Sequence, residues 1–321
     1  PSAGQTCHAY CSFCFRWAQF VGMPDLKLAT DESMRFCEYL RRHKEVTDVL
    51  ITGGDPMVMR TDVLAKFIEP LLGPEFEHIQ TVRIGTKSLS FWPYRYLTDR
   101  DADGLLGLLE KVVASGKHLA IMAHVNHWRE LSTPAVESAI QRIRSTGAVI
   151  RTQAPLIRRI NDDAGVWTRN WQRQVNLGMV PYYMFVERDT GAQDYFKVPL
   201  HRAAAIYREA ISQVSGLART ARGPVMSAMP GKVMIEGITE INGELVFALS
   251  MLQARDSSWC RRPFFADFDP RACWLTDLKP ALGQDRFFYE QELEELLAGG
   301  RRSSPLESSG ENISDYSNAT Y

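Results

Sequence analysis

The amino-acid sequence predicts an α/β protein built on a parallel sheet, and two observations support this prediction. Short apolar or β-branched runs recur along the first two thirds of the chain, and each is followed by an amphipathic stretch of helical periodicity. The distance between consecutive runs is that of one strand–helix–strand unit. Repeated units of this kind form a parallel sheet that is either doubly wound or closed into a barrel.

Five strands and five helices are expected in this part of the chain. The strands are predicted at 48–52, 81–86, 119–125, 148–155 and 180–187, and the helices at 61–72, 101–115, 133–145, 166–177 and 199–214. Polar and glycine-rich residues cluster where the strands end, which is the edge where both architectures place their sites. No GxGxxG pattern follows these strands, and this weakens a dinucleotide-binding interpretation.

The sequence changes character after about residue 222. An alternating stretch with the turn Asn242–Gly243 predicts a β-hairpin. Residues 255–295 are aromatic-rich and irregular and end in a charged helix, and the serine-rich remainder is expected to be disordered. We therefore divide the chain into a barrel-like part (1–222), a hairpin with a helical extension (223–298) and a polar tail (299–321).

Composition excludes several classes of protein. The chain has 321 residues, of which 45% are hydrophobic and 23% are charged, and its net charge is −1. This charge does not suggest a nucleic-acid partner or an anionic membrane surface, and no apolar run has the length of a membrane span. Six cysteines are too few for a disulfide scaffold, so we expect a reducing, cytoplasmic location. Because the first residue is proline, we expect the N-terminus to have been cut or processed.

Three cysteines lie within eight positions, in "CHAYCSFCFR" (7–16): Cys7, Cys11 and Cys14. A structural zinc site needs four ligands, and no second pair at a suitable spacing exists. A redox C-x-x-C pair would not need Cys7. Three thiolates suit a [4Fe–4S] cluster in which one iron stays open to another ligand. Cys37, by contrast, lies in an apolar-periodic stretch and is expected to be buried.

The spacing C-x-x-x-C-x-x-C, with an aromatic residue before the third cysteine, resembles the signature of radical S-adenosylmethionine enzymes. The resemblance implies that the amino and carboxylate groups of S-adenosylmethionine chelate the open iron. An electron, supplied by a donor such as flavodoxin or ferredoxin, then cleaves the sulfonium and produces a 5′-deoxyadenosyl radical. The cofactor supplies this chemistry, and the protein positions it.

Further motifs make the resemblance more specific. They are "TGGDP" (52–56), "RIGTKS" (83–88), "HVNH" (124–127), "QAPLIRRIND" (153–162) and "PYYMF" (181–185). Together with the cysteines they are similar to the lysine 2,3-aminomutase family, from about residue 5 to about 235. The resemblance implies a partial (β/α)6 TIM-like barrel. Its first strand is expected to precede Cys7 and to be missing or truncated here.

The strand ends supply the predicted cofactor-binding residues. Two glycines let a backbone approach a ligand closely, and an aspartate beside them offers an acceptor for the cofactor's ammonium. The same segment could also be an ordinary strand-to-helix turn. Two histidines three apart at a strand end lie on different faces, so a hydrogen bond is favoured over a metal pair. The predicted set is Gly53, Gly54, Asp55, Thr86, His124, Asn126 and Gln153, the last contacting the adenosyl group.

Members of this family hold pyridoxal phosphate on a lysine and form an imine with an amino acid. The radical removes a hydrogen from the β-carbon, and the amino group migrates from the α- to the β-carbon. Lys232, in "MPGKV", matches that lysine, although an exposed hairpin lysine is the alternative. The glycine run before it is shortened to Pro-Gly, and part of the family's phosphate-binding set precedes the cysteines. Arg16 matches the arginine that binds the substrate carboxylate.

The matching specificity positions differ from those of lysine-specific members, which use two aspartates to hold the distal ammonium. Here the positions hold Arg188 and Ser227. A cation there disfavours lysine and favours an acidic substrate such as glutamate or aspartate. Asp189 is the next residue, and a small loop shift would restore an acid.

The leading hypothesis is therefore a radical aminomutase that uses both cofactors and acts on a small amino acid. One alternative keeps the cluster but does not use pyridoxal phosphate. The other is a truncated, non-catalytic homologue. Family members often self-associate, so a homo-oligomer is also an expectation.

Overall fold

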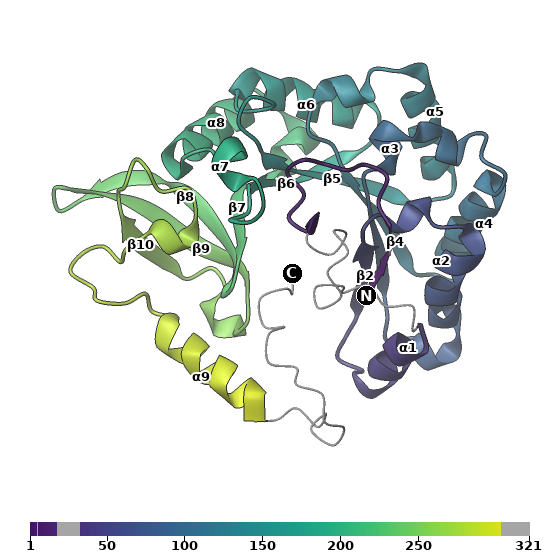
Figure 1. Cartoon of the computed structure of the whole chain (residues 1–321), viewed down its shortest axis with the longest axis horizontal. Coiled ribbons are helices and arrows are strands. Elements are labelled where there is room, and N and C mark those ends of the chain that lie inside the picture. Colours follow the sequence, from purple (N-terminus) through teal and green to yellow (C-terminus); the bar gives the residue numbers. More distant parts are fainter. Residues whose placement is uncertain (5, 18–32, 303–321) are drawn as a thin grey trace.

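The computed structural model describes residues 1–4, 6–17 and 33–302, and these form an α/β structure around one curved sheet (Figure 1). Seven strands run parallel in sequence order: β1 (Ser2–Gly4), β2 (Asp48–Gly53), β3 (Thr81–Thr86), β4 (His118–His124), β5 (Val149–Leu156), β6 (Val180–Val186) and β7 (Arg222–Ala228). In the described part of the chain β1 and β10 are the two edges of this sheet, so the barrel is open.

The helices follow the outer side of the curve (Figure 1). The longer ones are α1 (Ser33–Arg42), α2 (Thr61–Ile68), α4 (Ala102–Ala114), α5 (Pro134–Ser145), α6 (Ala164–Asn176) and α8 (Leu200–Ser212). The short helices α3 (Ser88–Phe91) and α7 (Gln193–Phe196) follow β3 and β6. The predicted fold class, a partial (β/α)6 TIM-like barrel, is confirmed. All five predicted strands begin and end within one residue of the predicted bounds.

Side-chain alternation explains why the strand predictions succeed. In β3, Val82 and Ile84 are fully buried against the outer helices, whereas Arg83 on the opposite face is only half-buried. In β2, Leu50 on the inner face is 36% exposed while Ile51 on the outer face is fully buried. Apolar residues thus mark the outer face, and the inner face of the curve is free to carry polar and charged groups.

The first strand corrects one expectation. The sequence predicts that the strand before Cys7 is missing or truncated, but Ser2–Gly4 forms a short strand, and Ser2 and Gly4 pair with Thr52 and Gly53 of β2. The backbone N–H of Thr52 also donates to the carbonyl oxygen of Pro1 at 3.0 Å. Three small residues carry no hydrophobic pattern, so only the pairing with β2 reveals this strand.

The C-terminal part extends the same sheet. Strands β8 (Gly231–Ile241), β9 (Glu244–Ala254) and β10 (Pro263–Asp267) are antiparallel to their neighbours. The predicted hairpin is confirmed: β8 and β9 are joined by Asn242 and Gly243, both with positive φ (53° and 84°), as a type I′ turn requires. A strand within 255–295 was not expected from the irregular sequence there.

The sequence predicts a boundary between two parts of the chain at residue 222. In the structure the sheet continues across this position, because residue 222 is the first of β7, which pairs with β6. The charged helix is confirmed as α9 (Glu290–Arg302), which therefore includes the first residues assigned to the tail. The remainder of the predicted tail, 303–321, lies outside the described residues.

Three groups of buried side chains hold the described structure together. One fills the space between β2–β5 and the helices outside them and includes Cys37, buried as predicted. A second packs α6 and α8 against β5 and β6 and includes the buried Trp167 and Trp171. The third lies on β7–β10, where Trp259 and Phe264 contact Tyr289. Burying each large side chain stabilises the fold by about 1.5–3 kcal/mol.

The buried Arg95 fixes the segment that follows the "TGGDP" turn. Its guanidinium donates to the carbonyl oxygens of Met57 and Met59, both at 2.9 Å, and forms an ion pair with Asp101 at 2.7 Å. Burial raises the pKa of Asp101, but hydrogen bonds from Thr61 and Arg95 outweigh this and lower it to about 2.

Within the described residues, no helix combines the length and apolarity that a membrane span requires.

Candidate active site

The cysteine-bearing loop (residues 6–17) is attached to the carboxyl end of β2. The N–H of Gly54 donates to the carbonyl oxygen of Gly4 at 2.7 Å, and the N–H of Asp55 donates to that of Thr6 at 2.9 Å. A Cβ atom on Gly54 would lie 2.2 Å from the Thr6 oxygen and 3.1 Å from Cβ of Cys7. A Cβ atom on Gly53, whose φ is +126°, would lie 2.5 Å from the oxygen of Gly4. Gly54 is therefore required by the approach of the cysteine loop, and Gly53 by the approach of β1.

We expect Gly54→Ala to reduce binding of an iron–sulfur cluster, because the added methyl group would displace Thr6 and Cys7. The iron and sulfide content after anaerobic reconstitution should fall about tenfold, as is typical when the support of a metal ligand is lost. Gly107→Ala in α4 is the matched control, because nothing lies within 4 Å of its added Cβ. Equal iron content in the two variants would show that the loop does not depend on this contact.

Cys7, Cys11 and Cys14 are half-buried and close enough to influence one another. Burial raises the pKa of each thiol, that of Cys11 to about 11, and neighbouring cysteines add to the rise for Cys11 and Cys14. Two cations oppose it: Lys87 lowers the pKa values of Cys7 and Cys11, and Arg16 that of Cys14. Cys7 and Cys14 are therefore within electrostatic range of each other, and the loop lies beside two positive charges.

These donors suit a cluster better than a single ion. In the described ranges, no three His, Cys, Asp or Glu side chains converge on a point where one metal ion could bind. A [4Fe–4S] cluster does not need such convergence, since each thiolate binds a different iron atom. The donor set, three thiols with nearby cations, fits a cluster with one open iron.

Asp55 is buried and uses both carboxylate oxygens within the protein. Oδ1 accepts from the N–H of Met57 at 3.1 Å and the hydroxyl of Thr86 at 2.7 Å, and Oδ2 accepts from the N–H groups of Lys87 and Ser88 at 2.8 and 3.0 Å. Burial raises the pKa of Asp55, and these hydrogen bonds oppose the rise. In the structure Asp55 and Thr86 join the ends of β2 and β3. That they also contact the cofactor stays a prediction.

Three other predicted residues gather beside the loop. His124 and Gln153 are paired in register on β4 and β5, and Phe13 of the loop packs on His124 with ring centroids 5.9 Å apart. His124 Nε2 donates to the side-chain oxygen of Asn126 at 2.7 Å, because an amide oxygen can only accept. Burial, with Lys87, lowers the pKa of His124 to about 3, so the ring is neutral and its Nδ1 retains a lone pair.

Two arginines pack against the same aromatic ring, that of Phe15. The guanidinium carbon of Arg16 is 5.3 Å from the centroid of Phe15, and that of Arg188 is 5.0 Å away. Arg16 donates to the carbonyl oxygen of Gly53 at 3.0 Å, and Arg188 to that of Ser227 at 2.8 Å. Burial lowers the pKa of both arginines. The structure thus brings Arg16, Arg188 and Ser227 together, whereas Asp189 is exposed.

Lys232 lies opposite Ser227 in the β7–β8 hairpin. Its ammonium is half-buried, with Nζ 5.0 Å from the ring centroid of Tyr183. Burial lowers the pKa of Lys232, as do Arg83 and Arg222, while Asp48 opposes them. It is therefore not the exposed hairpin lysine of the alternative interpretation.

Several of these charged residues were not found from the sequence. Arg83, Arg222 and Lys87 come together with the predicted residues only through the register of distant strands. Glu187 is 6% exposed at the end of β6, and burial raises its pKa to about 8. In the sequence, the feature that could have indicated Glu187 is that it is a charged residue directly after an apolar strand.

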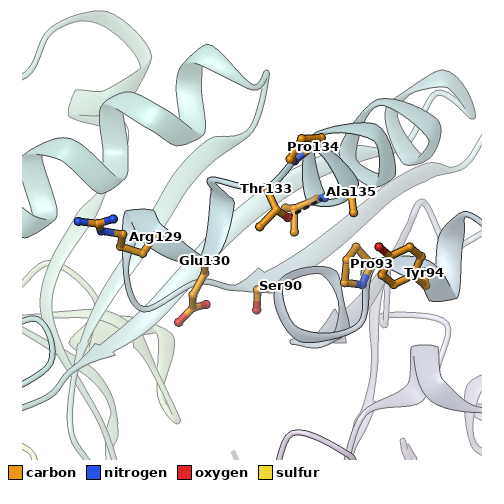
Figure 2. Close-up of a pocket in the computed structure, with 9 residues that line it drawn as sticks. Ser90, Pro93, Tyr94, Arg129, Glu130, Thr133, Pro134 and Ala135 are labelled. Atoms are coloured by element: carbon orange, nitrogen blue, oxygen red, sulfur yellow. Dashed lines mark hydrogen bonds between the residues drawn. The ribbon is translucent and has the colours of Figure 1, made fainter.

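A separate concavity of about 520 Å³ lies outside this site (Figure 2). Ser90, Pro93 and Tyr94 line one side, and Arg129, Glu130 and residues 133–136 line the other. Among the lining residues, Glu130 forms an ion pair of 3.0 Å with Lys87, and this pair connects the concavity to the candidate active site. None of the residues predicted to bind a cofactor, substrate or metal lines this concavity.

Comparison with known proteins gives a consistent group of relatives, although no protein-family model matches the chain. A protein of Aquifex aeolicus, provisionally named L-lysine 2,3-aminomutase, is 37% identical over 235 residues, which cover 73% of this chain and 60% of that protein. Glutamate 2,3-aminomutase of Clostridioides difficile is 27% identical over 66% of this chain, and L-lysine 2,3-aminomutase of Clostridium subterminale is 25% identical over 65%; each match covers 47% of the relative. The chain thus spans about half the length of the curated relatives that it matches.

Solved structures give a weaker likeness. SuiB of Streptococcus suis matches 64% of this chain and 43% of its own with a TM-score of 0.44 at 14% identity. A radical SAM methyltransferase of Sphaerobacter thermophilus matches 56% of this chain and 54% of its own with a TM-score of 0.41 at 11% identity. These scores are too low to support an inference. On its sequence relatives, its cysteine motif and its open barrel, the chain belongs to the lysine 2,3-aminomutase family of radical S-adenosylmethionine proteins, as a divergent member.

Proposed function

We propose that this protein is a radical S-adenosylmethionine 2,3-aminomutase that moves the amino group of an amino acid from the α- to the β-carbon. The observation that supports this most strongly is the arrangement of two features on one sheet edge. The cysteine loop is bonded to the end of β2, and the half-buried amine of Lys232 lies on the β7–β8 hairpin of the same sheet.

A [4Fe–4S] cluster with S-adenosylmethionine supplies the organic radical in this chemistry. Cys7, Cys11 and Cys14 would hold the cluster, and Lys87 and Arg16 would stabilise its negative charge. The backbone of Gly53 and Gly54, His124 Nδ1, Asn126 and Gln153 are the groups that we propose contact S-adenosylmethionine. We also propose that flavodoxin or ferredoxin supplies the electron. A cytoplasmic location and self-association stay predictions.

Pyridoxal phosphate makes the migrating nitrogen part of a conjugated system. Lys232 fits its attachment, because burial and two neighbouring arginines lower the pKa of the amine and raise the fraction of the nucleophilic, neutral form. Arg83 and Arg222 are suited to the phosphate, since both place positive charge beside Lys232, and Asp48, which also influences Lys232, forms an ion pair with Arg83. Arg16 would then bind the substrate carboxylate.

The experiment that tests this function is Lys232→Ala in the full-length protein, reconstituted anaerobically with iron, sulfide and pyridoxal phosphate. We expect the absorbance of lysine-bound pyridoxal phosphate to disappear and β-amino-acid formation to fall at least about a hundredfold, because the attachment point is lost. Cleavage of S-adenosylmethionine by dithionite should persist, because the cluster is untouched.

Lys66→Ala, at an exposed position of α2, is the control. Covalent pyridoxal phosphate in Lys232→Ala would contradict the assignment of the lysine. An unmodified protein that cleaves S-adenosylmethionine but binds no pyridoxal phosphate would favour the second candidate, a radical enzyme that does not use this cofactor. The shortened Pro-Gly segment before Lys232 is the feature that favours that candidate.

A further inference from the structure

Lys87 and Glu130 form a partly buried ion pair beside the cysteine loop. Lys87 directly follows β3, and Glu130 lies in the short helix η7 (Trp128–Leu131) after β4. The distance from Lys87 Nζ to Glu130 Oε2 is 3.0 Å, and the two side chains are 16% and 25% exposed. Because the cost of removing two charges from water offsets much of their attraction, such a pair is weak evidence for a stabilising role.

Hydrogen bonds fix both residues at the strand ends that carry the cysteine loop. The N–H of Lys87 donates to Asp55 Oδ2 at 2.8 Å, and the N–H of Asp55 donates to the carbonyl oxygen of Thr6 at 2.9 Å. Glu130 Oε2 also accepts from the N–H of Asn126 at 3.4 Å. The pair is therefore held between the start of the cysteine loop and the end of β4.

Both charges act on the cysteines, and they do so with opposite signs. Lys87 lowers the pKa values of Cys7 and Cys11, whereas Glu130 raises that of Cys11. Of the two, Lys87 has the larger influence on Cys11. A group bound to these thiols would therefore lie within range of a cation and of the anion that partly offsets it.

Resting on the proposed function, we infer that the Lys87–Glu130 pair sets the reduction potential of the cluster that the three cysteines would hold. Lys87 raises this potential, and Glu130 limits the rise. Reduction adds one electron to the cluster and makes its charge more negative by one unit, with no proton or leaving group involved. A nearby ammonium stabilises the more negative state, and a nearby carboxylate destabilises it. Net charge is one of the factors that set the potentials of iron–sulfur clusters.

A purely structural role for the pair predicts a different result. If the ion pair only joined the ends of β3 and β4, loss of either partner would break the same contact and would change the protein in the same way. If the charges act on the cluster, loss of the cation and loss of the anion shift the potential in opposite directions. The signs of the two shifts therefore separate the two roles.

The experiment is a redox titration of the full-length protein, reconstituted anaerobically with iron and sulfide. Dithionite supplies the electrons, S-adenosylmethionine is left out, and electron paramagnetic resonance quantifies the reduced cluster. At the midpoint potential of the unmodified protein, the ratio of reduced to oxidised cluster should fall about tenfold in Lys87→Met, a decrease of about 59 mV for one electron. In Glu130→Gln the ratio should rise by about threefold, since Glu130 has the weaker influence.

Two further variants complete the experiment. Lys87→Arg keeps the positive charge and should keep the ratio within about twofold of that of the unmodified protein. Lys111→Met is the matched control, because Lys111 forms a pair of 2.9 Å with Glu69 that is exposed and belongs to the outer helices. Its potential should equal that of the unmodified protein.

Each other outcome has a distinct meaning. Equal potentials in Lys87→Met, Glu130→Gln and the unmodified protein would overturn the inference, and so would shifts of the same sign. If Lys87→Met assembled no cluster, Glu130→Gln would decide, because a potential that does not rise there contradicts the inference. Weaker binding of S-adenosylmethionine by Lys87→Met, with an unchanged potential, would overturn it and assign the ammonium to the cofactor. An unmodified protein that holds no [4Fe–4S] cluster would contradict the proposed function itself, and the inference with it.

Discussion

Cys11→Ala is expected to abolish both cluster assembly and cleavage of S-adenosylmethionine. Each thiolate binds one iron, and two remaining ligands on a loop of this size cannot hold a cluster with an open iron. Burial keeps the Cys11 pKa near 11 without metal, so the thiolate depends on iron and on the charge of Lys87. Iron and sulfide content, visible absorbance and 5′-deoxyadenosine formation should all fall below about one hundredth of the unmodified values.

Cys37→Ala is the matched control, because this thiol is buried in α1 and takes no part in the loop. We expect it to cost about 1 kcal/mol of stability, as is usual for a small change in a core, and to keep its iron. If Cys11→Ala retained about four irons per chain and still cleaved S-adenosylmethionine, the cysteine loop would not be the cluster site. Zinc bound in place of iron would contradict the radical chemistry as well.

Asp55→Asn is expected to cause a second large effect, on stability as well as on the cluster. The amide can accept through one oxygen only, so its NH₂ group would face N–H donors that the second carboxylate oxygen now satisfies. Leaving buried donors unpaired, and replacing charge-assisted bonds, should lower the free energy of unfolding by about 3 kcal/mol. Because the N–H of Asp55 also binds Thr6, the cysteine loop should lose order with it.

Denaturant unfolding of the apoprotein measures the first effect, and iron content after reconstitution measures the second. Asp62→Asn in α2 is the control: its side chain is 60% exposed and pairs with Arg60 on the surface, where an ion pair contributes under about 1 kcal/mol. Equal stability of the two variants would show that the Asp55 network is not needed to join β2 to β3. A stable Asp55→Asn protein that fails only to bind S-adenosylmethionine would instead restore Asp55 as a direct ligand of the cofactor's ammonium.

The sequence alone determined the features that depend on local periodicity and spacing. Five strands could be placed within one residue because apolar side chains alternate along each of them and pack against the outer helices. The Asn242–Gly243 turn was identifiable because few residue pairs adopt two positive φ angles. The three-cysteine site was also identifiable from the sequence, because Cys7, Cys11 and Cys14 all lie in one short loop.

Only the tertiary structure decided what depends on pairing between distant strands. The short strand Ser2–Gly4 has no pattern of its own and is defined by β2. The hydrogen bonds that Asp55 accepts from Thr86, Lys87 and Ser88 exist only because β3 pairs with β2 and brings these residues to it. The cations around Lys232, and the burial of Glu187, likewise depend on which strands are neighbours. Hydrogen bonds and burial are set by strand register and sheet curvature, and neither is encoded in the spacing of residues along the chain.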